Sequence, residues 1–349
     1  MRSIATTLPI RSLILCAAIL AAITVPAHSQ PLYEDSARVS HRPLRREPPP
    51  AYEVTEEFVT LSEPSEPLQF QIVEEQVPQG EMIYGTDVPG QYGQPWSWQL
   101  LPEGLIYRSY LAGEREPRLA GVYAYDDRTD SWLIDATVGA RVGLIRYGTE
   151  TDIRPDGWEL DIEGAAFPRL LPEEEMDMAA TDFRIGIPLT YGYGPLRFKL
   201  AVYHLSAHLG DEYMLKNPDF PRINYVRDVA VFGTSYYATE DLRLYGEAGW
   251  AFHNDGGSKP WEFQFGIEYS PLRIPQTRRW SPFVAANGHL REELNYSGTF
   301  VFQTGIQFRG RYTERLLRMG VQYLTGPSPQ QEFYAFTEEQ IGAGIWYDF

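Results

Sequence analysis

Nine consecutive residues decide the fold: Trp261-Glu262-Phe263-Gln264-Phe265-Gly266-Ile267-Glu268-Tyr269. Every second residue is large and apolar, and the residues between are polar or small. Side chains of a β-strand point alternately to opposite faces, so this pattern predicts a strand with one apolar and one polar face. The same alternation recurs at residues 158–164, 183–187, 196–200, 242–247 and 317–323. The sequence therefore predicts an all-β protein built from amphipathic strands.

Two features favour a transmembrane barrel over a water-soluble β-sandwich or propeller. The first is that the predicted polar face carries charges of both signs, which suit a hydrated lumen braced by ion pairs. These residues are Asp135, Arg141, Glu163, Arg184, Lys199, Glu247, Glu268, Arg309 and Arg318. The second is the ending: Phe349 is preceded at alternate positions by Tyr347, Ile345, Ala343 and Ile341. This ending resembles the carboxy-terminal strand of bacterial outer-membrane proteins.

Composition supports a barrel and excludes other classes. The chain holds 23 Tyr, 17 Phe and 8 Trp, and aromatic girdles mark both membrane interfaces of a transmembrane barrel. Beyond the amino-terminal region no stretch of about 18 residues is apolar, so no membrane-spanning helix is expected. The net charge is −17. A chain this acidic is a poor nucleic-acid binder, because phosphate contacts require Lys and Arg.

The amino-terminal region divides into two predicted segments. Residues 1–29 are typical of a secretory signal peptide, with a basic start, an apolar stretch and the small-x-small sequence Ala27-His28-Ser29. Residues 30–95 are rich in Pro and Glu and bury little apolar surface, so we expect a disordered periplasmic leader. A tether or a partner-binding tail is the alternative. The one cysteine, Cys16, falls within the predicted signal peptide.

Residues 96–349 are expected to form a closed antiparallel transmembrane β-barrel of about 12 strands, integral to the outer membrane of a Gram-negative-type bacterium. Barrels keep short periplasmic turns and longer external loops, so residues 310–313 are predicted in the periplasm and residues 209–225 outside. The apolar run at residues 105–111 is expected to plug or line the lumen. Expected partners are outer-membrane lipid or lipopolysaccharide and, during assembly, the barrel-insertion machinery.

The most distinctive local stretch is residues 203–213. Strand parity places His204, Ser206 and His208 on the lipid-facing side, where a polar residue is costly at mid-depth and tolerated near the interface. A His two positions from a Ser on one strand face can act as its general base, provided that a third group holds the imidazole. The pattern therefore points to nucleophilic catalysis at the outer surface.

This pattern resembles the His-x-Ser of outer-membrane phospholipase and lipid A deacylase barrels. The resemblance implies that His204 is the base, Ser206 the nucleophile, and Asp228, at the start of the next strand, the orienting group. It departs from those enzymes at Ala207, where they commonly carry Asn. The alternative is structural, with His204 in the interfacial aromatic girdle and Ser206 satisfying a strand edge.

A second candidate site is a metal site at the external mouth. His208, Asp211, His253 and His289 lie near predicted external strand ends, and imidazoles with a carboxylate can hold a transition metal. Their spacing matches no local metal motif. No cofactor is otherwise expected, and calcium or a transition metal is left open.

The region from residue 102 to the end also resembles an uncharacterised bacterial outer-membrane family, a domain of unknown function, through residues 105–113 and 204–213. That resemblance implies a barrel and supplies no activity. Three function classes stay open: a structural, binding or interaction barrel at the cell surface, a serine esterase acting on outer-leaflet lipid acyl chains, and a narrow channel for small solutes.

Overall fold

The computed structural model describes residues 95–150, 154–272, 279–310 and 315–349. The predicted signal peptide and all but the last residue of the predicted leader lie outside these ranges. The strands are β1 (Ser97–Leu100), β2 (Leu119–Asp126), β3 (Ser131–Gly148), β4 (Gly157–Leu171), β5 (Asp177–Tyr193), β6 (Leu196–Leu209), β7 (Val226–Tyr237), β8 (Leu242–Asp255), β9 (Trp261–Tyr269), β10 (Ser281–Arg291), β11 (Gly298–Arg309), β12 (Leu316–Pro327) and β13 (Thr337–Asp348). The helical elements are α2 (Asp211–Lys216) and the 3-10 turns η1 (Pro172–Glu174), η2 (Glu292–Leu294) and η3 (Gln331–Phe333).

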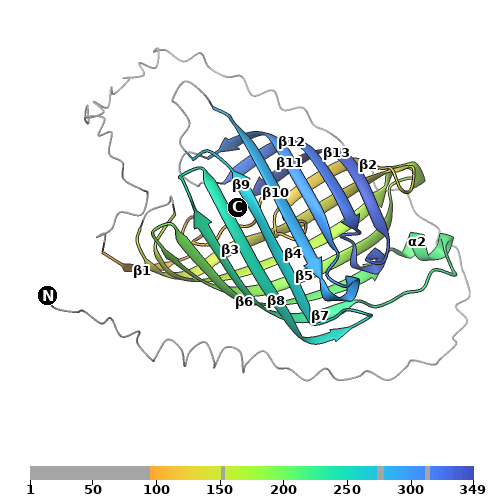
Figure 1. Ribbon diagram of the computed structural model, residues 1–349, viewed down its shortest axis with the longest axis horizontal. Coiled ribbons are helices and arrows are strands. Elements are labelled where there is room, and N and C mark those ends of the chain that lie inside the picture. Colours follow the sequence, from red (N-terminus) through yellow and green to blue (C-terminus); the bar gives the residue numbers. More distant parts are fainter. Residues whose placement is uncertain (1–94, 151–153, 273–278, 311–314) are drawn as a thin grey trace, which may run out of the picture. The chain divides into compact units, whose positions relative to one another are not determined.

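Strands β2 to β13 form a closed barrel (Figure 1). Each strand pairs antiparallel with its neighbour in the chain, and β13 pairs with β2 from Tyr347↔Leu119 to Gln340↔Asp126. The predicted twelve-stranded antiparallel barrel is therefore confirmed. The short strand β1 pairs with the end of β3, from Ser97↔Gly148 to Leu100↔Ile145. None of the helices in the described ranges is both long and apolar enough to span a membrane.

The barrel wall has its apolar face outside and its polar face inside. In β9, Phe265 is 50% exposed and Ile267 is 44% exposed, whereas Glu262 and Glu268 are buried. The same arrangement holds in β6, where Arg197 and Lys199 are buried while Leu196 and Leu200 are exposed. The alternation read from the sequence is thus the alternation between the outer surface and the lumen.

A segment between β1 and β2, residues 101–118, occupies the lumen, and we refer to it as the plug. Ile106, Tyr107 and Tyr110 in the plug are almost fully buried. The plug is bonded to the wall: the Leu111 amide donates to Glu268 at 2.5 Å, and Arg318 donates to the Leu111 carbonyl at 3.1 Å. The expectation that residues 105–111 plug or line the lumen agrees with this placement.

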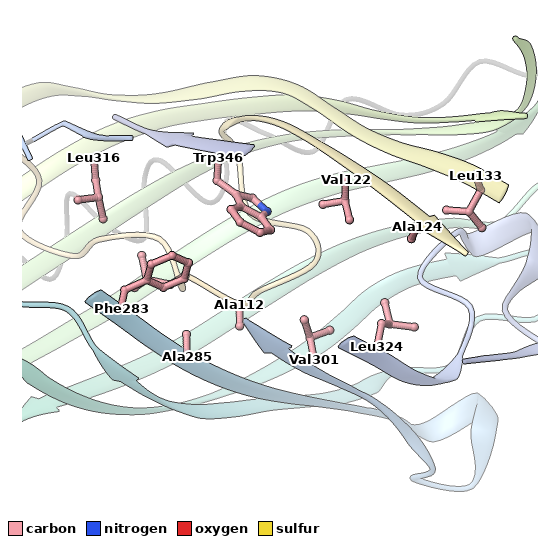
Figure 2. Close-up of a cluster of buried hydrophobic side chains, with 11 residues drawn as sticks. Ala112, Val122, Ala124, Leu133, Phe283, Ala285, Val301, Leu316, Leu324 and Trp346 are labelled. Carbon is pink, nitrogen blue, oxygen red and sulfur yellow. The ribbon is translucent and has the colours of Figure 1, made fainter. Parts of the chain in front are cut away.

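Next to the plug, inward apolar side chains form a small core. Figure 2 shows Ala112 of the plug among side chains from the surrounding wall, including Phe283, Val301 and Trp346. Three cavities lined by plug residues measure about 20, 60 and 60 Å³. A buried water needs at least roughly 10–15 Å³ by this measure, so each cavity has room for at most a few water molecules.

The rest of the lumen is braced by buried ion pairs. Arg169 of β4, for example, bonds to Asp135 of β3 at 2.7 Å and to Glu338 of β13 at 2.5 Å. Other pairs are Arg115–Asp182, Arg118–Asp348, Arg141–Asp161, Arg146–Glu159, Arg184–Glu163, Lys199–Glu247, Arg227–Glu262 and Arg243–Glu268. Buried charges of this kind persist only where they are paired and hydrogen-bonded. The lumen is therefore a packed polar core.

Candidate functional site

Three polar residues stand side by side on the outer wall. His204 of β6 is paired in register with Asp228 of β7, and Asp228 is paired with His253 of β8. One carboxylate oxygen of Asp228 lies 2.7 Å from His204 Nδ1, and the other lies 3.2 Å from His253 Nδ1. The three side chains are 46%, 31% and 60% exposed respectively. Asp228 therefore holds two imidazoles on the outer surface of the barrel.

A β-bulge brings His253 into this row. The register between β7 and β8 shifts between Asp228 and Val229, where Asp228 pairs with His253 and Val229 pairs with Ala251. Phe252 is the extra residue, and both Phe252 and His253 are exposed. A bulge leaves two residues opposite one and re-aims the side chains beside it. Without it, alternation would turn His253 into the lumen.

Ser206 lies on the same outer face, two positions beyond His204, as strand parity predicts. Its strand partners are Phe183 of β5 and Val226 of β7, and its side chain is half-buried. Within the described ranges no hydrogen bond joins the Ser206 hydroxyl to His204. Since Asp228 holds Nδ1 of His204, its Nε2 is the nitrogen left to approach Ser206. Ala207, where the sequence departs from the lipase pattern, is buried.

A shallow apolar groove of about 340 Å³ begins beside His204. Its sides include Val138, Phe183 and Ile185, each strongly exposed on the outer wall, and Gly164 and Ala165 also line it. Small residues between larger ones create the depression, because they leave space where a neighbouring strand carries a long side chain. The groove thus runs along the apolar outer surface to the imidazole of His204.

Aromatic residues show where this row sits along the barrel. The neighbouring rung, two residues nearer the end at which Phe349 lies, pairs Val202 with Ala230 and Ala230 with Trp250. Trp250 is itself in register with Trp261, and both indoles are exposed. Exposed aromatics on the outside of a barrel are typical of the level at which the membrane interface lies.

The proposed metal ligands are not brought together. His289 is in the lumen, where its Nε2 lies 3.2 Å from Glu262, because it has the inward parity of Phe283 and Ala285 in β10. His208 is on the outer face with its ring against Phe183 at 5.7 Å between centroids. His253 contacts Asp228, and Asp211 begins helix α2.

The barrel wall therefore separates His289 from His208 and His253. In the described ranges, no group of three or more His, Cys, Asp or Glu side chains could hold a metal ion. The structure therefore does not bring His208, Asp211, His253 and His289 together. Of these four residues, His253 is the one that contacts the His204–Asp228 pair. The bulge that places it there could not be recognised from the alternation of the sequence.

Comparisons with known proteins find one matching family model and several similar solved structures. A family model described as "Protein of unknown function (DUF1207)" matches residues 52–349. A search of curated proteins finds no match. Among solved structures, outer membrane phospholipase A from Escherichia coli is similar at 10% identity and a TM-score of 0.44, over 66% of this chain and 90% of that one.

Two further solved structures are similar over the same share of this chain. The calcium-bound outer membrane phospholipase dimer from Salmonella typhi is 10% identical with a TM-score of 0.45, over 66% of this chain and 91% of that one. A TodX monoaromatic hydrocarbon channel mutant is 11% identical with a TM-score of 0.34, over 66% of this chain and 87% of that one.

Proposed function

The chain belongs to the DUF1207 family, whose description assigns no function. From this premise we propose that the protein is an integral outer-membrane barrel with a plugged lumen. We propose further that it hydrolyses esters of outer-leaflet lipids, with Ser206 as the nucleophile. The observation that carries the proposal is the 2.7 Å contact between Asp228 and His204 Nδ1 on the outer wall, two residues from that serine.

The membrane assignment is supported by the outer surface of the barrel. Large apolar side chains are exposed on strands all around it, among them Val138, Ile185, Phe232, Phe265, Val321 and Ile345. Soluble monomers rarely expose contiguous apolar surface of more than a few hundred Å². An apolar band with polar residues facing inward is the pattern of an outer-membrane barrel.

The chemistry follows from the three side chains. The Ser206 hydroxyl attacks the ester carbonyl while His204 Nε2 accepts its proton, and Asp228 holds the imidazole and stabilises its charged form. When the tetrahedral intermediate collapses, His204 returns the proton to the leaving alcohol. Water, activated by the same imidazole, then releases the acyl group as a carboxylic acid and restores Ser206.

The groove beside His204 supplies a reason for a lipid substrate. An acyl chain lying against Val138, Phe183 and Ile185 would bring its ester end toward the imidazole. No step of this scheme needs access through the lumen. The plug therefore does not obstruct it, whereas it does obstruct a channel.

The test is covalent labelling of the folded full chain in detergent by a fluorophosphonate probe, together with fatty-acid release from mixed micelles of phospholipid or lipid A. We expect wild type and Ser297→Ala, which removes an exposed serine in the β10–β11 connection, to react with the probe. Ser206→Ala and Asp228→Leu should lose both labelling and hydrolysis by at least about a hundredfold, the lower bound of general-base catalysis.

Equal labelling of wild type and Ser206→Ala would rule out ester hydrolysis through Ser206. A barrel that folds, inserts and releases no fatty acid would be left with the structural or binding role at the cell surface.

A further inference from the structure

The groove beside His204 has a floor that depends on a glycine. Gly164 occupies an outward position of β4, in step with Ile162, which is 41% exposed. A Cβ added to Gly164 would have one atom within 4 Å, the carbonyl oxygen of Arg184 at 3.6 Å. A glycine inside a strand weakens it and often marks a place where a ligand or another backbone comes close. The wall therefore carries an unfilled space above Gly164.

A path joins this space to His204 across strand β5. The register pairs Gly164 with Ile185, and Ile185 with His204. Phe183 and Ile185 stand outward on the two sides of Arg184, whose own side chain is turned into the lumen. All of these residues border the groove. The groove therefore crosses β5 over the backbone of Arg184, between two apolar side chains.

The groove is closed on the side toward the end at which Phe349 lies. One outward position from Gly164 in that direction, β4 carries Ile162, and β3 carries its strand partner Val142. Both side chains are strongly exposed, at 41% and 45%, and neither borders the groove. At the level of Gly164 itself, β3 carries only Ala140. Ile162 and Val142 thus form a ridge that ends the groove.

The distance from Ser206 to this ridge limits what the groove can hold. Ser206 and Ala166 are both in register with Phe183 of β5. Two strand spacings and four residues of β4 therefore separate Ser206 from Ile162. At roughly 4.8 Å per strand and 3.3 Å per residue, the diagonal is about 16 Å. Three backbone bonds span at most about 3.6 Å, so an extended chain of single bonds needs about 13 bonds to cover this distance.

We propose that Gly164 and Ile162 determine the length of the acyl chain that is cleaved at Ser206, with Gly164 making room for the chain and Ile162 ending that room. The inference rests on the proposed ester hydrolysis and adds its substrate class, an ester of medium chain length such as dodecanoyl. Lipid tails are as apolar as the groove, so burial alone contributes little and the selection comes from packing and shape.

The first experiment measures kcat/KM of the folded full chain for p-nitrophenyl esters of octanoic, dodecanoic and hexadecanoic acid in mixed maltoside micelles. Wild type should cleave the hexadecanoyl ester at least about tenfold less efficiently than the other two, the lower bound of discrimination by size in an apolar pocket. Ile162→Ala should raise the hexadecanoyl value to the dodecanoyl value. The control is Ile267→Ala in β9, at a residue that is 44% exposed, and it should keep the wild-type ratio.

A second variant fills the groove. Gly164→Leu should lower kcat/KM for the dodecanoyl ester at least about tenfold, because its side chain takes the place of the acyl chain. The matched control is Gly246→Leu, at an outward position of β8 where an added Cβ has no atom within 4 Å. It should keep the wild-type value. Since both glycines have open space beside them, both variants should fold, as heat-modifiable migration will show.

A third measurement does not depend on hydrolysis. In Ser206→Ala, dodecanoic acid with a terminal diazirine is photoactivated, and its adducts are located by mass spectrometry. The adducts should concentrate on residues 138–142 and 160–166. Adding Gly164→Leu should abolish them, whereas adding Gly246→Leu should leave them.

The outcomes separate this inference from the proposed hydrolysis. Adducts at these residues, without ester hydrolysis by wild type, would reject the esterase and support an acyl-binding groove. Hydrolysis with equal kcat/KM for the dodecanoyl and hexadecanoyl esters would overturn the inference and leave the role of Ser206 intact. Adducts spread evenly over the outer wall would overturn it as well.

Discussion

Phe252 and His253 are neighbours in β8, yet both side chains lie on the outer face of the barrel. A regular strand would send one of them into the lumen. The extra residue thus places His253 against the Asp228 oxygen that His204 does not use. The carboxylate is held from both sides, and its position toward His204 therefore depends on an extra residue in the adjacent strand β8.

The contribution of His253 can be measured by replacing it. In His253→Leu, Asp228 keeps His204 but loses its second partner, so the imidazole is held less firmly. We expect kcat/KM for ester hydrolysis to fall about tenfold, equivalent to roughly 1.4 kcal/mol of transition-state stabilisation. The matched control is His208→Leu, which removes an outward histidine that contacts Phe183. If both variants lose activity equally, His253 does not position Asp228.

The buried ion pairs predict large and unequal effects on stability. Arg169→Met leaves Asp135 and Glu338 without the guanidinium between them. Removing one partner of a buried pair costs about 3–5 kcal/mol, so the free energy of unfolding in urea should fall by that amount. Lys216→Met, which removes exposed contacts to Glu174 and Asp177, should change it little. A small loss for Arg169→Met would mean that water reaches the two carboxylates.

The plug predicts an electrically silent protein. Planar bilayers containing wild type should show no stepwise conductance, because residues 101–118 fill the lumen. Glu268→Ala removes the acceptor of the Leu111 amide and should produce brief openings while the barrel still shows heat-modifiable migration. Steady conductance steps in wild type would contradict a plugged lumen and would favour the narrow channel for small solutes as the function.

The orientation of the barrel predicts which turns are reachable from outside a cell. Thr129 is exposed in the β2–β3 turn and Ala238 is exposed in the β7–β8 turn, at opposite ends. In intact cells a membrane-impermeant maleimide should label Thr129→Cys and spare Ala238→Cys, since short turns at the end near Phe349 are expected in the periplasm. Lysed cells should label both. Labelling of Ala238→Cys alone in intact cells would invert the assignment.

Much of the fold could be predicted because a period of two survives in the sequence. The outward parity of His204 and Ser206 follows from Leu196 and Leu200 in the same strand, and Asp228 was expected on the adjacent one. The position of His253 could not be predicted, because a bulge depends on pairing between strands. The pairing of buried charges could not be predicted for a similar reason: Arg169 and Glu338 are distant in the chain and meet only in the closed barrel.

The pairing of β13 with β2 has a consequence for the order of assembly. The plug immediately precedes β2, and its two ends are attached to strands of the wall. Chains rarely thread through a loop that has already formed. Residues 101–118 must therefore be inside while the seam between the first and last barrel strands is still open. The final zippering step encloses them, and the interior of this protein is determined before its perimeter is complete.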